Sequence, residues 1–569
     1  MSDPSSYRPH RPTFAEMFTP KLVTVMREGY DLAAFRADAI AGLTVAIVAL
    51  PLSMAIAIAC GLSPDRGLYT AIVGGFIISA LGGSRFQIGG PAGAFIVLIA
   101  TIVERNGYDG LVLATALAGA IMMVIGFLRL GTYIKYIPFP VTVGFTSGIA
   151  VIIFASQLKE LFGLKIDKEP AALIPKLETI WNAMPTFHLP TMAVAALAIA
   201  IILVLRKLRP TWPGFLIAVV VGAIASLLLA KAGYPVATVG SRFGGVPSSL
   251  PAPALPAFSL TKFRAVLPDA LAIALLGAIT GLLSAVVVDG ISRRQHRSNS
   301  ELVAEGIANI ASVCFGGIPA TGAVARSITN VRHGSRGPVS GMLHALCLLV
   351  FMLVAAPLAS YIPLAAFSGV LAVVSWNMAD KHEFAALLRT SRGDALVLLS
   401  TFLLTIFEDL TLGIAVGVTL GAFLFLHRMA EAVEIDGGGS LLGEDLPDDV
   451  SRPAEVYTGI PKTNADVQVY RIRGAFFFGA TSTIISTLDR MGQMPKAFVF
   501  DFSAVPLADS TAAKSLEAFA LKLKRHGTRF YIAGAIPSVR RTLFKAGLRE
   551  PDVTYAATVE DAEAAAKLP

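Results

Sequence analysis

The stretch "GGIPATGAVARS", Gly316 to Ser327, places glycines, a proline and an arginine inside an apolar tract. A charged side chain at the centre of a bilayer costs roughly 2.5–3.5 kcal/mol on insertion scales. That cost is offset when the arginine faces a water-filled cavity and meets an anion, which predicts an anion site at Arg326. The alternative is a structural pair with a carboxylate, or a side chain that reaches the membrane surface.

A matching break lies earlier in the chain, in "LGGSRFQIGGPAGAFIVLIATIV", where Gly89, Gly90 and Pro91 precede a short apolar run. Short segments interrupted by Gly and Pro at corresponding places in two halves indicate a transporter's binding site. Half-helices that begin after Pro91 and Pro319 would point their amino ends, with free N–H groups, at one another. Two such ends and a guanidinium make an anion site. Two ordinary kinks are the alternative.

The elements around these breaks are membrane helices. The chain has 569 residues, of which 54% are hydrophobic and only 15% charged. Apolar runs of about 20 residues recur between Asp38 and Leu426, without the period-two alternation of a lipid-facing barrel. The sequence therefore predicts a polytopic α-helical membrane protein. We expect its net charge of +8 to reflect the orientation of the chain in the membrane rather than nucleic-acid binding, because cytosolic loops are enriched in Lys and Arg. This places the basic clusters in cytosolic loops and predicts that both termini are cytoplasmic.

The pattern gives no support for catalysis or a bound cofactor. The sequence offers no metal-ligand cluster and no nucleophile–base pair at suggestive spacing, so we expect no enzyme, no catalytic residue, no cofactor and no metal. Cys60, Cys314 and Cys347 all lie in apolar tracts, which indicates packing.

Composition divides the chain into zones. A proline-rich tract from Ala230 to Arg264 splits the apolar part into halves of similar size, and the acidic, glycine-rich "DGGGSLLGEDLPDDVSRP" resembles a linker. After it, strand patterns alternate with helical ones, which predicts a small α/β domain. The expected boundaries are 1–35 for a cytosolic segment, 36–430 for the membrane domain (repeats 36–232 and 262–430), 431–457 for the linker and 458–569 for the tail domain.

Several stretches together resemble the sulfate permease (SulP) family of anion transporters. They are "DAIAGLTVAIVALPLSMAIAIACGLSPDRGLYTAIV", "SNSELVAEGIANIASVCFGGIPATGAVARSITNVRHGSRGPVSG", and a tail containing "FVFDFSAVPLADSTAAKSLEAF" that looks like a STAS domain. The resemblance implies about fourteen segments in seven-plus-seven inverted repeats, core and gate bundles, and a cytosolic STAS domain. It also implies a homodimer and elevator-like alternating access.

The family pattern also implies which residues meet the substrate. Ser53 and Met54 follow Pro51 in the first segment. The remaining positions lie at the two breaks: Ala92, Gly93, Thr321, Gly322, Ala325 and Arg326.

One position departs from the pattern. Many members carry a carboxylate, thought to couple protons or sodium, where this chain has Thr280. Threonine offers at most a hydroxyl, and Ser284, one turn on, offers another oxygen, so these two are the candidates for a coupling ion. Asp269, Asp289 and Glu305 are expected towards helix ends, in structural roles. In the tail, Ser510 is expected to cap a helix, or alternatively to be phosphorylated.

The sequence thus predicts a secondary transporter, or symporter, of sulfate, bicarbonate or a C4-dicarboxylate in a bacterial inner membrane. Its expected partners are the anion, a co-transported proton or sodium ion, membrane lipids and a second copy. The alternatives are an anion channel on the same scaffold and a membrane-anchored STAS signalling protein.

Overall fold

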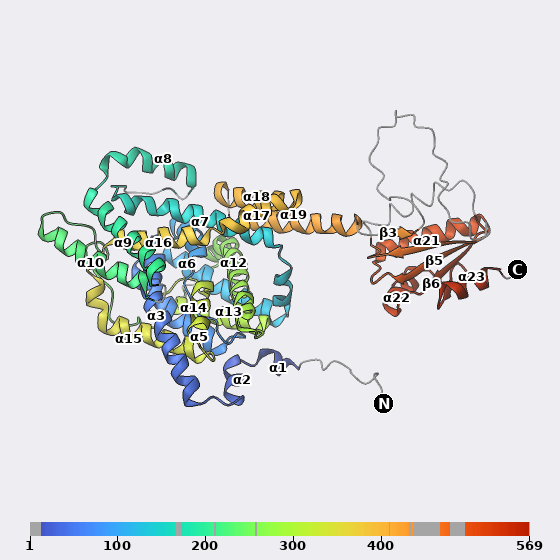
Figure 1. Ribbon diagram of the computed structural model, residues 1–569, viewed down its shortest axis with the longest axis horizontal. Coiled ribbons are helices and arrows are strands. Elements are labelled where there is room, and N and C mark those ends of the chain that lie inside the picture. The colour runs from blue at the N-terminus through green and yellow to red at the C-terminus, as the bar shows by residue number, and fades with distance from the viewer. Residues whose placement is uncertain are drawn as a thin grey trace. The chain divides into compact units, whose positions relative to one another are not determined.

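The computed structural model describes residues 13–166, 170, 172–209, 212–256, 259–408, 410–431, 434–436, 467–477 and 495–567. The chain forms two compact units, Met1–Val418 and Thr419–Pro569. The first is helical, and the second contains a sheet with helices (Figure 1).

The first half of the membrane part contains seven apolar segments. Its helices are α3 (Leu32–Ala59), the composite α4 (Pro64–Tyr69), η2 (Thr70–Gly74) and α5 (Gly75–Leu81), then η3 (Gly93–Phe95) with α6 (Ile96–Phe127), α7 (Phe139–Phe162), α9 (Leu189–Leu208) and α10 (Gly214–Lys231). Gly107 divides α6 in two, because its φ of 69° and ψ of −179° are not helical. The third segment is therefore the short half-helix that the Gly-Gly-Pro break predicts.

The second half contains seven more segments, of which α14 is short and polar. They are α12 (Leu260–Ser292), α13 (Ser298–Cys314), α14 (Val324–Arg332), α15 (Val339–Ala359), α16 (Leu364–Met378), α18 (Arg392–Phe407) and α19 (Leu410–Glu431). Shorter helices connect or precede these segments: α1 (Phe14–Phe18), α2 (Lys21–Arg27), η4 (Leu130–Tyr136), α8 (Leu173–Ala183), η5 (Met184–Thr186), α11 (Val239–Phe243) and α17 (Lys381–Thr390). Within the described residues the segments thus number seven before the 232–259 tract and seven after it, as the fold class predicts.

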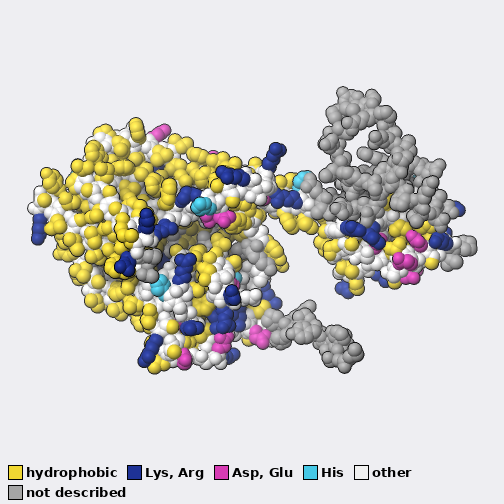
Figure 2. Space-filling model, in the orientation of Figure 1, with side chains coloured by type: hydrophobic (Ala, Val, Ile, Leu, Met, Phe, Trp, Pro, Cys, Tyr) yellow, Lys and Arg dark blue, Asp and Glu magenta, His cyan; other side chains and the backbone are white. Residues whose placement is uncertain are grey.

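The surface of this unit is apolar. Eight described helices are long and apolar enough to cross a membrane: α3, η3 with α6, α7, α9, α10, α12, α15 and α19. Leu203, Leu228 and Val354 are exposed on three of them. Figure 2 shows hydrophobic side chains over α9, α10 and α15, and basic side chains gathered near α2 and α13. Such an apolar surface is stable against lipid rather than water, which makes this a membrane protein.

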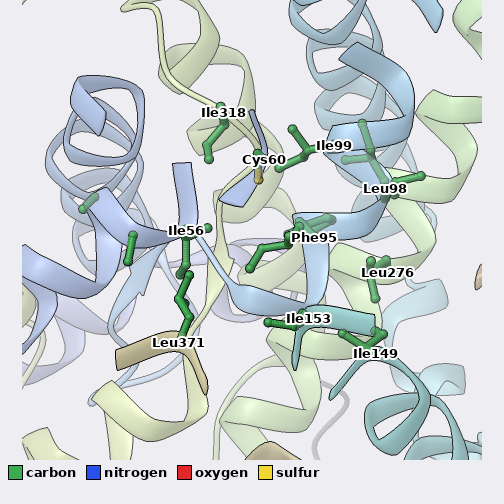
Figure 3. Close-up of a cluster of buried hydrophobic side chains, with 14 of the residues drawn as sticks. Ile56, Cys60, Phe95, Leu98, Ile99, Ile149, Ile153, Leu276, Ile318 and Leu371 are labelled. Carbon is green, nitrogen blue, oxygen red and sulfur yellow. The ribbon is translucent and has the colours of Figure 1, made fainter. Parts of the chain in front are cut away.

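The segments pack as two bundles. The core bundle consists of α3 to α6 and α12 to α15, and the gate bundle of α7, α9, α10, α16 and α18. Figure 3 shows the apolar cluster that joins them, with Ile56, Phe95 and Leu276 from the core bundle and Ile153 and Leu371 from the gate bundle. Each bundle takes segments from both halves of the sequence.

The second unit is the expected α/β domain. Strands β3 (Glu434–Asp436), β4 (Val467–Arg473), β5 (Ala497–Ala504), β6 (Arg529–Ala533) and β7 (Thr554–Ala556) form one sheet in that order. Strand β3 runs antiparallel to β4 and the other pairs are parallel. The described helices are α21 (Ser510–Arg525), α22 (Pro537–Ala546) and α23 (Val559–Lys567). Of the predicted linker, residues 434–436 form β3, whereas 437–457 lie outside the described residues.

The structure corrects the expected cap of α21. Ser510 is the first helical residue, and Asp509 occupies the N-cap position. The Asp509 carboxylate accepts a hydrogen bond of 2.7 Å from the backbone N–H of Ala512. Asp509 has extended backbone angles and so turns its side chain back towards the first turn, which Ser510, already inside the helix, does not.

Candidate binding site at the paired breaks

The two breaks predicted from the sequence meet in space. Strand β1 (Gly89–Gly90) pairs antiparallel with β2 (Thr321–Gly322), with Gly89 opposite Gly322 and Gly90 opposite Thr321. Because the paired strands run in opposite directions, the helices that follow them leave the pair in opposite directions. The starts of η3 and α14 therefore lie on either side of one short strand crossing.

Polar side chains from the core bundle hold the second break in shape. Gly316 takes a φ of 73°, which favours glycine, and it ends α13. The backbone N–H of Ile318 donates to Thr70 Oγ1 at 2.7 Å, and its carbonyl accepts from Ser312 Oγ at 2.8 Å. Asn309 bonds both the N–H and the carbonyl of Ala320. The non-helical backbone is thus satisfied inside the protein, as buried irregular backbone must be.

Further bonds tie α14 to the segment before β1. Ser327 Oγ accepts from the N–H of Ile88 at 2.9 Å, and Asn330 donates to the carbonyl of Phe86 at 3.0 Å. Within the part of the chain that the structure describes, no side chain caps the first turn of η3 or of α14. Their first N–H groups consequently remain available to a ligand.

Arg326 lies at this crossing and is only 3% exposed. Nη2 donates to Ser53 Oγ at 3.1 Å and to the carbonyl of Pro91 at 3.4 Å. Nε and Nη1 have no hydrogen-bond partner among the described residues, and a Cβ at Gly90 would overlap Nη1. A buried cation with free donors and no carboxylate bonded to it can bind an anion.

The structure brings most of the predicted site residues together. Ser53 and Met54 are buried on α3, and Ser53 contacts Arg326. Ala92 and Gly93, both partly buried, lead into η3, and Thr321 and Gly322 form β2. Ala325 differs, because it is exposed on α14 whereas its neighbour Arg326 is buried.

The coupling-ion candidates on α12 also reach the crossing. Thr280 Oγ1 lies 3.1 Å from Thr321 Oγ1, and it donates to the carbonyl of Leu276 at 2.7 Å. Ser284 is fully buried, and its hydroxyl lies 3.5 Å from that of Ser327. The two hydroxyls therefore face β2 and α14 respectively.

The expectation for Glu305 is wrong. It lies near the middle of α13, is fully buried, and its Oε1 accepts from the N–H of Gly322 at 3.0 Å and from Gln87 Nε2 at 3.2 Å. Asp269 and Asp289 do have structural partners, since Asp269 pairs with Arg105 and Asp289 with His296. The sequence analysis thus missed Glu305 and Gln87. Glu305 could have been found as a carboxylate inside an apolar tract of the second half of the membrane part, which also contains Thr280.

The sequence matches two family models in the order expected. The model described as "Sulfate permease family" covers residues 35–401, and "STAS domain" covers 460–562. The chain belongs to the sulfate permease family. This family is one of anion transporters. The first matched region includes the strand crossing, and the second includes strands β4 to β7 of the second unit.

Named relatives of this sulfate permease agree with that assignment. It is 37% identical over 525 residues to the "Putative sulfate transporter YvdB" of Bacillus subtilis, covering 92% of this chain and 95% of the relative. It is 29% identical to the "Bicarbonate transporter BicA" of a Picosynechococcus strain, covering 90% of each.

Two solved structures share the fold. The transmembrane domain of a cyanobacterial bicarbonate transporter BicA aligns with a TM-score of 0.62 at 30% identity, covering 68% of this chain and 98% of that one. The structure of SLC26A9 aligns with a TM-score of 0.81 at 18% identity, covering 96% and 92%, and it bears on the fold alone.

Proposed function

We propose that this sulfate permease is a secondary transporter of a small anion of the sulfate, bicarbonate or C4-dicarboxylate type. The observation that carries the proposal is Arg326, whose buried guanidinium has no partner for Nε and Nη1 among the described residues and lies beside two uncapped helix starts. Anions bind where helix N-termini and a guanidinium converge. The printed names of the relatives, sulfate transporter and bicarbonate transporter, favour the same substrate class.

The anion would bind against Arg326, the first-turn N–H groups that follow Ala92 and Ala323, and the side chains of Ser53 and Met54. It would be moved without covalent change. The core bundle would carry it past the gate bundle in an elevator-like motion, because the residues that form the site all belong to the core bundle.

We place the protein in a bacterial inner membrane, as a homodimer with both termini cytoplasmic. Basic side chains gather near α2 and α13 (Figure 2), and cytosolic surfaces of membrane proteins are enriched in lysine and arginine. We keep the domain boundaries expected from the sequence as part of the proposal, except that β3 at 434–436 belongs to the sheet, and we assign the STAS domain to the cytosolic side in a regulatory or stabilising role. Ser510 remains a candidate for modification there.

Uptake of labelled anion into proteoliposomes tests the proposal. Sulfate, bicarbonate and succinate would be compared for the wild-type protein and for Arg326→Ala, with insertion and folding checked by size-exclusion chromatography. We expect saturable uptake of one anion that is lost in Arg326→Ala. Saturable uptake that the variant retains in full would reject Arg326 as the binding group.

The same assay separates the alternatives. A carrier shows saturable flux that is stimulated by anion on the opposite side, whereas a channel shows neither property. Uptake that survives deletion of residues 440–569 would argue against a protein whose function is STAS signalling, and a folded protein that moves none of the three anions would favour it.

A further inference from the structure

Glu305 projects from α13 into a notch in α12. The notch exists because position 281 is glycine, and a Cβ there would overlap the carboxylate of Glu305. Glycine at position 322 has a similar effect, since a Cβ there would overlap the side chain of Gln87. The carboxylate therefore fits among α12, β2 and the segment before β1 because both positions lack side chains.

Among the described residues, only one oxygen of the Glu305 carboxylate accepts hydrogen bonds. Oε1 accepts from the N–H of Gly322 at 3.0 Å and from Gln87 Nε2 at 3.2 Å, and the hydroxyl of Thr321 lies 3.5 Å away. Oε2 is buried and has no hydrogen-bond partner among the described residues, and the same is true of Gln87 Oε1. Buried polar atoms almost always have partners, so this pair of oxygens indicates an acceptor site for a hydrogen ion or a cation.

The carboxylate also lies near the first coupling-ion candidate, Thr280. The hydroxyl of Thr321 lies 3.1 Å from that of Thr280 on α12 and 3.5 Å from Glu305 Oε1. A single hydroxyl thus connects Thr280 with a carboxylate supplied by a neighbouring helix.

The anion site and Glu305 share the strand crossing. Glu305 bonds the N–H of Gly322 in β2, while Arg326 lies against Gly90, which is paired with Thr321. Arg326 and an ionised Glu305 sum to zero charge. Binding a singly charged anion such as bicarbonate together with one proton keeps that sum, and for a doubly charged anion the proton halves the charge that is added. Binding the anion alone leaves a larger net charge in the protein interior, which is costly.

Few charged groups act on Glu305 from the helices around it. Its ionisable neighbour is Glu301, one turn earlier on α13, which accepts from the N–H of Ser84 at 2.8 Å. The residues of α6 and η2 that contact α13 include Gly119, Met123 and Gly74, which carry no charge.

The surroundings on α12 and β2 are uncharged as well, since Thr280, Gly281 and Thr321 contribute only hydroxyls and backbone. The ionisable groups Asp289 and His296 near the end of α12 act on Glu301. Protonation of Glu305 therefore depends chiefly on its own burial, on Glu301, and on the hydrogen bonds that its carboxylate accepts at β2 and from Gln87.

We infer that Glu305 is the proton-binding residue that couples anion transport to a proton gradient in this protein. The inference rests on the proposed function. A proton requires one free oxygen, which Oε2 provides, whereas a metal cation requires several oxygens, and N–H groups already face Oε1. Anion and proton bind together because each offsets the charge that the other brings.

Two transport assays in proteoliposomes test this inference separately from the proposed function. Exchange of labelled anion at equal pH on both sides measures transport, and accumulation against a concentration gradient under an imposed pH difference measures proton coupling. For Glu305→Gln, which keeps an acceptor oxygen and the side-chain shape, we expect exchange within about threefold of wild type and accumulation reduced at least about tenfold. Glu301→Gln, which removes the other buried carboxylate of α13, is the matched control and should keep accumulation.

The outcomes are distinct. No exchange by the wild-type protein would reject the proposed function itself. Exchange without accumulation under a pH difference, accumulation driven only by a sodium gradient, or full accumulation by Glu305→Gln would overturn the assignment of Glu305. If Glu305→Gln does not fold, Glu305→Asp carries the test, since a displaced carboxylate should shift the pH at half-maximal accumulation, and an unchanged pH profile would overturn the inference.

Discussion

Nη2 of Arg326 donates a hydrogen bond to the hydroxyl of Ser53 across 3.1 Å, although 273 residues separate the two in the sequence. Ser53 belongs to α3 in the first repeat and Arg326 to α14 in the second, so the bond fixes the guanidinium relative to both halves. The bond leaves Nε and Nη1 without partners among the described residues.

Ser53→Ala should weaken anion binding. A hydrogen bond to a charged group contributes about 1.5–3 kcal/mol, so we expect KM for the transported anion to rise about tenfold or more with a smaller change in maximal rate. Saturation curves in proteoliposomes measure this. Ser368→Ala is the control, because Ser368 is also buried but its hydroxyl bonds the carbonyl of Ala365 in its own helix α16. Equal KM values for Ser53→Ala and wild type would contradict the prediction.

Gly90→Ala should block the site without unfolding the protein. A Cβ at Gly90 would overlap Nη1 of Arg326, so the guanidinium must move away from the helix starts. We expect uptake to fall at least about tenfold while size-exclusion behaviour is retained. Gly61→Ala is the matched control, since Gly61 also has a positive φ and a Cβ there meets nothing within 4 Å. Normal uptake by Gly90→Ala would mean that the position of Nη1 is unimportant.

Asp509→Ala should destabilise the start of α21 more than Ser510→Ala does. Loss of an N-cap side chain costs about 1 kcal/mol, and Asp509, not Ser510, bonds the N–H of Ala512. Hydrogen exchange of peptides from 505–520 in the full-length protein reports the difference. The prediction is wrong if Ser510→Ala accelerates exchange as much as Asp509→Ala.

The STAS sheet should lose stability at low pH through Asp501. Burial of this carboxylate acts to raise its pKa, but hydrogen bonds from Ser503 and from Arg471, whose Nε lies 2.6 Å away, hold the pKa below its usual range. Because the folded pKa is depressed, the stabilisation is complete above the unfolded value of about 4 and is lost as the pH falls through the folded value.

Hydrogen exchange of β5 in the full-length protein measures this contribution. At pH 7, Asp501→Asn should exchange faster than wild type, and the difference should shrink below about pH 4 once intrinsic rates are corrected. A difference that persists unchanged at low pH would show that the ion pair is not its source.

The breaks at Pro91 and Pro319 could be predicted because Gly and Pro disturb a helix wherever they occur, whatever surrounds them. The pairing of Gly90 with Thr321 could not, since no local pattern relates two dipeptides more than 200 residues apart. The position of Arg326 in an apolar tract was enough to propose an anion-binding role, whereas its bond to Ser53 depends on the packing of α3 against α14.

Glu305 was misjudged for a physical reason. Its distance from the helix ends depends on where α13 begins and ends, and its contact with β2 depends on the absence of a side chain at Gly281. Neither property is local to Glu305. The prediction of Ser510 as the cap of α21 was wrong for a similar but more local reason. Asp509 and Ser510 have similar capping propensities, and only the backbone angles decide which of them is the N-cap.

The backbone pairing of β1 with β2 restricts how the protein can move. A hinge that swung the two sequence halves apart at the binding site would break main-chain hydrogen bonds in a place without bulk water, where replacement partners are scarce. The proposed elevator-like motion would therefore carry the site as one rigid unit built from both halves. The two bundles would then slide along the apolar cluster that joins them, which contains Phe95 of the core bundle and Ile153 of the gate bundle.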